Sequence, residues 1–224
     1  MSKELAVAKL ENKVYNFEQR SDEWYKIREL KVTGSPCEKI MKPRGLGQGG
    51  QTYCKQIVKE TILKNKEERY VSAAMQQGID REPIAAEVYA EEHMVEVTEV
   101  GFIVFYTENP KEKHLNGFLG ISPDRLVGKK GGLEIKCPEP DKHTSNLLEQ
   151  DCPSEYYDQI QMSLFVTGRE WWDLMSYNPD FKEGFKEKYW RILPNPEWQL
   201  KFIQRATEAK IIVDDFLKTL KIGR

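Results

Sequence analysis

The chain reads SPDRLVGKKGGLEIKC at residues 122–137, where acidic residues and a lysine accompany two segments of extended character. Residues 118–122 and 132–137 have the composition of strands, and Gly131 and Gly132 are typical of a turn between them. We therefore expect a hairpin that carries acidic side chains.

This predicted hairpin brings its charged residues together. The side chains of a strand alternate between its two faces, so Glu134 and Lys136 point to the same face while Ile135 points into the core. Asp124, at the end of the first strand, can converge on them. The pattern predicts two carboxylates and an ammonium group in one place.

Such a group of side chains suits a divalent cation. Two carboxylates and a main-chain carbonyl are the hard oxygen ligands that Mg²⁺ prefers, and the ion keeps waters for chemistry. A neighbouring lysine can orient or deprotonate an attacking water and stabilise the charge that grows on phosphorus. These are the groups that phosphodiester hydrolysis needs. The same residue types also occur by chance on charged hairpins, where they form only surface ion pairs.

The rest of the chain alternates between helical and extended patterns. Pro83 interrupts a long helical pattern and marks either a kink or the first turn of a new helix capped near Asp80. This order predicts an α/β fold in which a central mixed β-sheet is flanked by helices. We expect helices with polar caps at Ser21, Ser35 and Asn195, further helices over 52–65, 72–93 and 154–166, and strands near 101–106, 171–177 and 188–193 in addition to the hairpin.

Two further patterns do not indicate a functional site. Residues 45–50 formally satisfy G-x-G-x-x-G, but they follow a helix rather than a strand, so we interpret 44–51 as a loop and not as a dinucleotide site. His93, His114 and His143 are scattered and are expected at the surface. Neither a histidine metal site nor a Ser-His-Asp triad is indicated.

Length and charge fit a single globular domain. With 224 residues the chain can bury a substantial core, and we treat 1–224 as one domain in which 1–16 form a peripheral N-terminal segment. The 34 basic and 36 acidic residues leave a net charge of -2. If DNA is the substrate, the basic residues must therefore be concentrated locally.

The cysteines and the apolar segments indicate in which cellular compartment the protein acts. The four cysteines form no C-x-x-C pair, which favours a reduced, cytoplasmic protein. No apolar run approaches the roughly 20 residues of a membrane helix. We expect no membrane partner.

These motifs resemble those of a known family. Pro123-Asp124 followed by Glu134-Ile135-Lys136 matches the signature of the PD-(D/E)XK nuclease superfamily. This resemblance implies a restriction-endonuclease-like core in a single exonuclease domain over 1–224. From about Phe17 to the final helix, the chain is similar to the lambda exonuclease (YqaJ-type viral recombinase) family. Five segments agree in order, namely 24–28 with 33–35, 78–82, 122–124, 133–138, and 159–161 with 166–167.

The resemblance implies a metal site. Asp124 and Glu134 would hold the metal together with the main-chain carbonyl of Ile135, Lys136 would act on the water, and Glu82 would support a second metal or its water. The family implies two Mg²⁺ ions, for which Mn²⁺ can substitute. Without the resemblance, Glu82 would be interpreted as a surface charge.

The resemblance also implies a site for the substrate. Gln159 would hold the active lysine or a substrate phosphate, and Arg28, Ser35 and Ser122 would bind a terminal 5′-phosphate. A guanidinium is a forked donor, and a helix start presents free N–H groups to an anion. From the residues alone, Arg28 is a solvated helix residue, Ser35 a helix cap and Gln159 a partly buried amide.

The function implied is a Mg²⁺-dependent 5′-to-3′ exonuclease on linear double-stranded DNA, which leaves 3′ overhangs for recombination by annealing. The family further implies a ring-shaped homotrimer, a single-strand annealing protein as partner, and action in the cytoplasm of a bacterial host or a phage-infected cell. Two alternatives remain open, a structure-specific endonuclease of the same fold and a catalytically silent module that binds DNA ends. An iron–sulfur variant would require a cysteine trio near the C-terminus, and the sequence lacks one.

Overall fold

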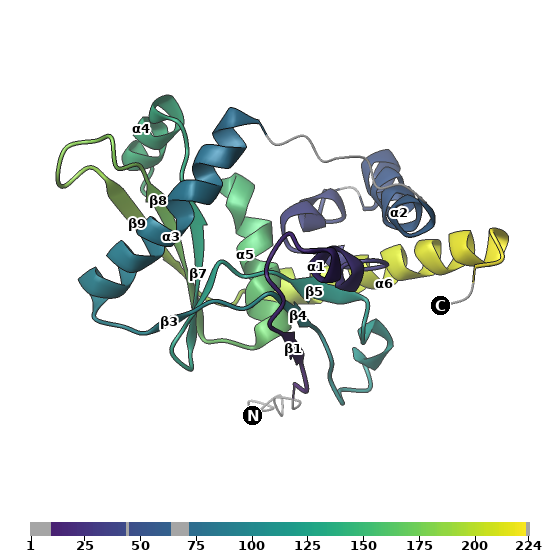
Figure 1. The fold of residues 1–224 in the computed structure, drawn as a ribbon. Coiled ribbons are helices and arrows are strands. Elements are labelled where there is room, and N and C mark those ends of the chain that lie inside the picture. Colours follow the sequence, from purple (N-terminus) through teal and green to yellow (C-terminus); the bar gives the residue numbers. More distant parts are fainter. Residues whose placement is uncertain (1–9, 44, 64–71, 223–224) are drawn as a thin grey trace, which may run out of the picture.

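A computed structural model describes residues 10–43, 45–63 and 72–222, and it has two mixed sheets with helices packed against them (Figure 1). The α/β class expected from the sequence is confirmed, although the strands form two sheets instead of one. No helix in the described ranges is both long and apolar enough to cross a membrane.

The larger sheet has five strands in the order β3-β6-β7-β8-β9. β7 and β8 run parallel, and the other neighbours are antiparallel. A parallel pair needs a long crossover, and the helices α4 (Pro140–Leu148) and α5 (Ser154–Thr167) lie in the segment that makes it. The strands are β3 (Val97–Thr98), β6 (Arg125–Val127), β7 (Gly131–Lys136), β8 (Trp171–Tyr177) and β9 (Glu187–Ile192).

The smaller sheet has four short strands in the order β1-β4-β5-β2. Its edge strand β1 lies within the segment expected to be peripheral, and it pairs antiparallel with β4. β2 and β5 are parallel. The strands are β1 (Lys13–Tyr15), β2 (Val32–Thr33), β4 (Phe102–Val104) and β5 (Leu119–Ile121).

Two of the three predicted polar caps, Ser21 and Asn195, are present. The side chain of Ser21 accepts a hydrogen bond from the main-chain N–H of Trp24, and that of Asn195 accepts two such bonds. Pro83 lies inside one continuous helix, so the alternative of a new helix near Asp80 is wrong. The helices are α1 (Asp22–Ile27), α2 (Gly47–Ile62), α3 (Ala73–His93), α4 (Pro140–Leu148), α5 (Ser154–Thr167) and α6 (Pro196–Thr219), with 3-10 turns η1 (Ser35–Lys39) and η2 (Lys113–Leu115).

The larger sheet is covered on both faces. On one face, Ala86 and Tyr89 of α3 pack against Ile135 of β7. On the other face, Ile160 of α5 belongs to a larger core that includes Trp172 of β8 and residues of α6. Figure 1 shows α3 crossing this sheet, while α5 lies between it and the smaller sheet. Contacts of α5 with both sheets join the two halves of the molecule.

The hairpin differs from the prediction in its turn and in its first strand. Gly131 and Gly132 lie within β7, and the hairpin partner of β7 is the unpredicted strand β6. A Cβ added at Gly131 would lie 2.2 Å from the Trp171 ring, and one at Gly132 would lie 2.3 Å from the Trp172 ring. The two glycines are therefore needed for close packing of β7 against β8, and not for chain reversal.

Three other predictions are wrong. Residues 47–51, expected in a loop, form the first turns of α2. Ser35 does not cap a helix, because Gly34 holds that position and Ser35 is the first residue of a 3-10 turn. His143 is buried in α4, where its ring nitrogens lie 2.9 Å from Ser176 Oγ and 2.9 Å from the carbonyl oxygen of Phe185. Residues 1–9 of the expected N-terminal segment, residue 44 and residues 64–65, which the predictions also cover, lie outside the described residues.

Candidate active site

β7 places a carboxylate and an ammonium group side by side. Glu134 and Lys136 are two residues apart on this strand, and Lys136 Nζ donates a hydrogen bond to Glu134 Oε1 at 2.6 Å. Ile135 between them points to the opposite face, where it is 5% exposed in the core below α3. The alternation predicted from the sequence is present in the structure.

Asp124 reaches the same place from the residue before β6. Its Oδ2 accepts a hydrogen bond of 2.6 Å from the main-chain N–H of Ile135. This bond fixes the Asp124 carboxylate beside the strand that carries Glu134. Asp124 thus belongs to the chain entering the β6–β7 hairpin, and not to the end of one of its paired strands.

A helix on one side of the larger sheet supplies an amide to the group. Gln159 of α5 donates from Nε2 to Glu134 Oε1 at 2.6 Å. The same oxygen accepts the bond from Lys136, so two donors from two elements share it. Glu134 is 2% exposed, which makes both bonds important for holding its charge inside the protein.

The helix on the other side supplies a further acid. Glu82 of α3 accepts a hydrogen bond through Oε1 from Arg125 Nη1, at 3.1 Å. Arg125, on β6, is 8% exposed and also donates to the main-chain oxygen of Asp124. The sequence prediction contained no role for Arg125, because it placed no strand there.

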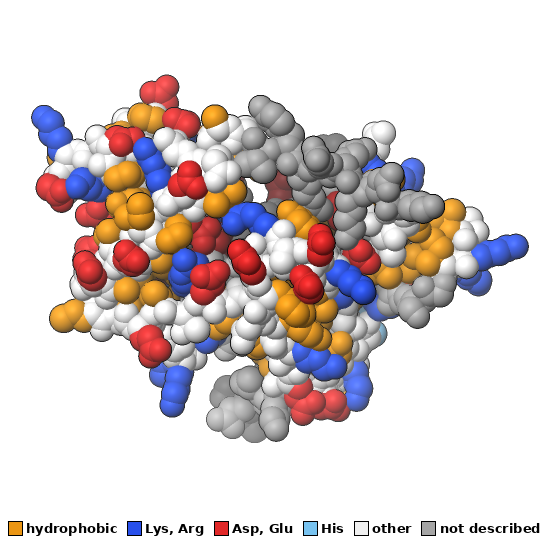
Figure 2. All heavy atoms as spheres, in the orientation of Figure 1, with side chains coloured by type: hydrophobic (Ala, Val, Ile, Leu, Met, Phe, Trp, Pro, Cys, Tyr) orange, Lys and Arg blue, Asp and Glu red, His pale blue; other side chains and the backbone are white. Residues whose placement is uncertain are grey.

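All nine residues that the sequence predicts for the site line one cleft. The cleft has a volume of about 530 Å³ and opens between α1 and α3. Figure 2 shows acidic and basic side chains intermingled on this face, with a hollow between the two helices. The nine residues are Arg28, Ser35, Glu82, Ser122, Asp124, Glu134, Ile135, Lys136 and Gln159.

The predicted phosphate pocket is built around one hydroxyl group. Ser122 Oγ accepts hydrogen bonds from Arg28 Nη1 at 3.1 Å and from the indole Nε1 of Trp24 at 2.8 Å. The guanidinium carbon of Arg28 lies 4.0 Å from the centre of the Trp24 ring, which keeps its plane fixed. Ser35 is exposed nearby at the cleft wall.

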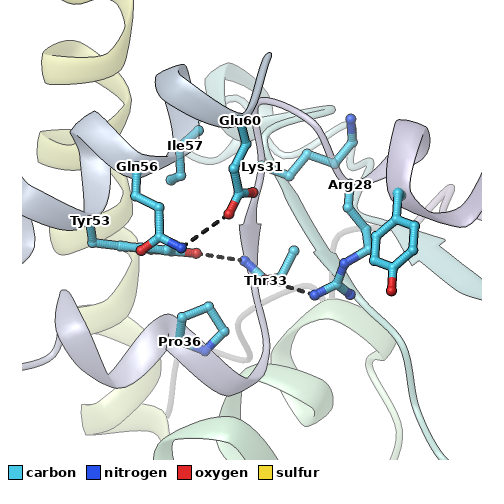
Figure 3. A pocket seen from close by; sticks show the side chains of 9 residues that line it. Arg28, Lys31, Thr33, Pro36, Tyr53, Gln56, Ile57 and Glu60 are labelled. Carbon is cyan, nitrogen blue, oxygen red and sulfur yellow. Dashed lines mark hydrogen bonds between the residues drawn. The ribbon is translucent and has the colours of Figure 1, made fainter. Parts of the chain in front are cut away.

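Arg28 lines a second, smaller cavity of about 220 Å³ (Figure 3). Its Nη2 donates to Thr33 Oγ1 at 3.4 Å, and the main-chain N–H of Thr33 donates to the Tyr53 hydroxyl at 3.3 Å. On α2, Gln56 donates to Glu60 at 3.0 Å. Arg28 therefore lies between the two cavities and is held by contacts on both sides.

Burial and neighbouring carboxylates raise the pKa of Asp124 and of Glu82 in the cleft. Burial is the main cause of the raised pKa of Asp124, and the charges of Glu134 and Glu82 add to it against the opposing charge of Lys136. Burial also raises the pKa of Glu82, while Arg125 opposes this change. The carboxylates are thus close enough to repel, and a cation bound among them would be stabilised.

For Lys136, burial and neighbouring charges act on the pKa in opposite directions. Burial alone would lower its pKa, but the charges of Glu134 and Asp124 outweigh burial and raise the pKa of the ammonium group. Lys136 Nζ also lies 5.4 Å from the centre of the Tyr156 ring. Burial and a hydrogen bond with Glu155 raise the pKa of Tyr156 to about 12, so both groups keep their protons at neutral pH.

The residues present fit a hard cation better than a soft one. No three His, Cys, Asp or Glu side chains among the described residues form a preassembled metal site. However, the hydrogen bonds to Asp124 and Glu134 use Oδ2 and Oε1, which leaves Oδ1 and Oε2 as further carboxylate oxygens. Oxygen donors of this kind suit Mg²⁺ or Mn²⁺.

The chain matches known proteins in sequence and in structure. A sequence model of the YqaJ-like viral recombinase domain matches residues 23–170. An alkaline exonuclease of Laribacter hongkongensis, LHK-Exo, has 28% sequence identity and a TM-score of 0.78, and the match covers 90% of this chain and 96% of that one. The same protein crystallised with dAMP matches with a TM-score of 0.73 at 27% identity, covering 90% of this chain and 98% of that one.

A more distant structure has the same fold. A phage-related exonuclease of Haemophilus somnus 129PT has a TM-score of 0.65 at 14% identity, and the match covers 88% of this chain and 99% of that chain. The search of curated proteins found no match. The sequence match over residues 23–170, which contains every residue of the cleft named above, shows that the chain belongs to the YqaJ-like viral recombinase family and is a nuclease.

Proposed function

We propose that this nuclease is a Mg²⁺-dependent 5′-to-3′ exonuclease that degrades linear double-stranded DNA and leaves 3′ single-stranded overhangs for recombination by strand annealing. The observation that carries the proposal is the meeting of Asp124, Glu134 and Lys136 in a cleft that also contains Arg28. The family and the likeness to an alkaline exonuclease support deoxyribonuclease activity.

Three groups of this chain would hold the first metal ion, namely Asp124, Glu134 and the main-chain carbonyl of Ile135. Glu82 would hold a second ion or its water, and Mn²⁺ can substitute for Mg²⁺. When bound, the ion supplies a water of lowered pKa and neutralises charge on the phosphate. The raised pKa of Asp124 supports this assignment, because repulsion among buried acids favours a bound cation.

Lys136 would act as a cationic donor. Because its pKa is raised, it keeps its proton and can donate a hydrogen bond to the attacking water or to a phosphate oxygen. This favours orientation over deprotonation of the water. Gln159 would keep Glu134 and, through it, Lys136 in place, since all three meet at one oxygen.

Arg28, Ser122 and Ser35 would bind the terminal 5′-phosphate. A guanidinium matches two phosphate oxygens at once, and stacking on Trp24 orients the guanidinium of Arg28 before substrate arrives. Ser122 lies next to the proposed metal ligands in sequence and bonds Arg28 in space. The pocket would thereby set the distance between the 5′ end and the scissile bond.

The direction of digestion tests the proposal. We would incubate the protein with Mg²⁺ and linear duplexes labelled on either end of either strand, with or without a 5′-phosphate, and with a circular duplex. Release of nucleotides from 5′-phosphorylated ends, with the circle intact, is expected. Cleavage of the circle would indicate an endonuclease, and binding without digestion would indicate a silent module that binds DNA ends.

Replacing the lysine should separate chemistry from binding. Lys136→Ala should lower the hydrolysis rate at least about 100-fold, because a donor to the developing charge is lost. Binding of duplex DNA in Ca²⁺, measured by fluorescence anisotropy, should persist. Lys142→Ala is the matched control, since Lys142 lies 6.0 Å from the same Tyr156 ring but does not line the cleft. Unchanged hydrolysis by Lys136→Ala would exclude the assigned role.

The proposal extends to assembly and partners. The active form would be a ring-shaped homotrimer that encloses DNA, and a single-strand annealing protein would take over the exposed 3′ strand. Both would act in the cytoplasm of a bacterial host or a phage-infected cell. The family membership of residues 23–170 supports this extension.

A further inference from the structure

A buried arginine connects two acids of the cleft. Arg125 Nη1 donates to Glu82 Oε1 at 3.1 Å and also to the main-chain oxygen of Asp124. An NH₂ group of a guanidinium has two hydrogens, so one nitrogen can serve both acceptors. A side chain of α3 is thus tied to the segment that carries Asp124.

The surroundings of Arg125 make this pairing necessary. Arg125 is paired with Leu133 across the β6–β7 hairpin, and Leu133 packs in the apolar cluster beneath α3 together with Val127. A cation that is 8% exposed in such a place needs a carboxylate in contact. The other nearby acid, Glu99, is 3.9 Å away and its side chain is 61% exposed, so it contributes little.

The bond restricts what Glu82 can offer to the cleft. Oε1 of Glu82 is engaged by Arg125, and no described side chain binds Oε2. Rotation of the carboxylate away from Arg125 would break this hydrogen bond. Arg125 therefore selects one rotamer and one oxygen of Glu82.

We propose that Arg125 is a positioning residue that sets the affinity of the cleft for divalent cations through Glu82. This inference rests on the proposed function, in which Glu82 supports the second ion or its water. Groups that orient metal ligands typically change metal affinity 10- to 100-fold when they are replaced. Arg125 acts in this way on Glu82 and has no direct contact with substrate or metal.

A double-mutant cycle read by Mn²⁺ binding tests the inference without any nuclease assay. We would measure Mn²⁺ titrations by calorimetry for the wild type, Arg125→Met, Glu82→Gln and the double variant. When Glu82 is present, Arg125→Met should weaken Mn²⁺ binding about 10-fold. When Glu82 is replaced by Gln, the same substitution should weaken binding less than about twofold. Arg125→Lys, which keeps the positive charge and one donor nitrogen, should retain part of the affinity. It replaces Arg125→Met in the cycle if that variant does not fold.

The matched control removes an arginine of the same sheet. Arg191 on β9 makes two hydrogen bonds of 2.8 Å to the buried Asp173, and neither residue lines the cleft. Arg191→Met should leave Mn²⁺ binding unchanged. Equal losses of affinity in both Glu82 backgrounds, or no loss in either, would overturn the role of Arg125 alone. A wild-type protein without Mn²⁺ binding would instead overturn the metal site of the proposed function, and Arg125 with it.

Discussion

The carboxyl group of Asp124 lies where burial and two neighbouring acids oppose its ionisation. This arrangement suits cation binding, but it makes the metal-free protein less stable wherever Asp124 is charged. Its pKa is raised above the ordinary value, so the folded state binds its proton more tightly than the unfolded state does. Stability is therefore lost as the pH rises from the unfolded pKa of about 3.9 through the folded pKa.

Replacing Asp124 should stabilise the metal-free protein. Asp124→Asn keeps an oxygen that can accept the Ile135 N–H bond and removes the charge. In EDTA at pH 8, we expect its free energy of unfolding to exceed that of the wild type by on the order of 1–3 kcal/mol. The gain should disappear near pH 4. Urea unfolding at both pH values measures it, and the exposed Asp151→Asn controls for loss of one carboxylate elsewhere. A gain that does not depend on pH would contradict this explanation.

Residue patterns predicted the centre of the cleft better than its walls. The two-residue spacing of Glu134 and Lys136 was sufficient to place them together, because strand geometry fixes which side chains share a face. Glu82 and Gln159 come from α3 and α5, and no local pattern indicates that these helices meet at β7. Their positions depended on resemblance alone. Arg125 followed from neither source.

Among the elements, β4, β5, β8, α5 and α6 were predicted, whereas the nine-residue helix α4 and several short strands were not. β8 was predicted with its observed bounds, α5 was predicted to within one residue, and α6 lies where its apolar periodicity places it. β2, β3 and β6 have two or three residues each, too few for a period to be visible. Their strand conformation depends on pairing with distant segments.

The packing of β7 against β8 gives a test at this scale. A Cβ at Gly132 would lie 2.3 Å from the fully buried ring of Trp172, so Gly132→Ala should lower the free energy of unfolding by about 1–3 kcal/mol. Gly49→Ala on α2 is the control, because a Cβ there meets no atom within 4 Å. That variant should gain up to about 1 kcal/mol from helix propensity. Chemical denaturation compares them, and similar effects of both would disprove the packing role.

For the whole molecule, the net charge bears on whether DNA binding requires assembly of several chains. The net charge of -2 requires local concentration of basic residues if the protein is to hold DNA. On the face in Figure 2, acidic and basic side chains alternate and no basic patch stands out. A basic surface formed in an assembly would reconcile the charge with DNA binding.

The mass in solution tests the assembly. Multi-angle light scattering should give three times the chain mass of 26.2 kDa at micromolar concentration. Added salt should weaken DNA binding steeply, because phosphate contacts release counterions. A mass of one chain at all concentrations would exclude the ring, while leaving the chemistry of the cleft untouched.

Glu134 Oε1 accepts hydrogen bonds from both Lys136 and Gln159, and this affects how well the enzyme tolerates substitutions elsewhere. Since α5 packs against both sheets, small shifts in that helix move the amide and, with it, the ammonium group. Substitutions deep in the interior beneath α5 would thus slow turnover well before the protein loses its fold. The positions of the reacting groups therefore depend on how the hydrophobic interior packs.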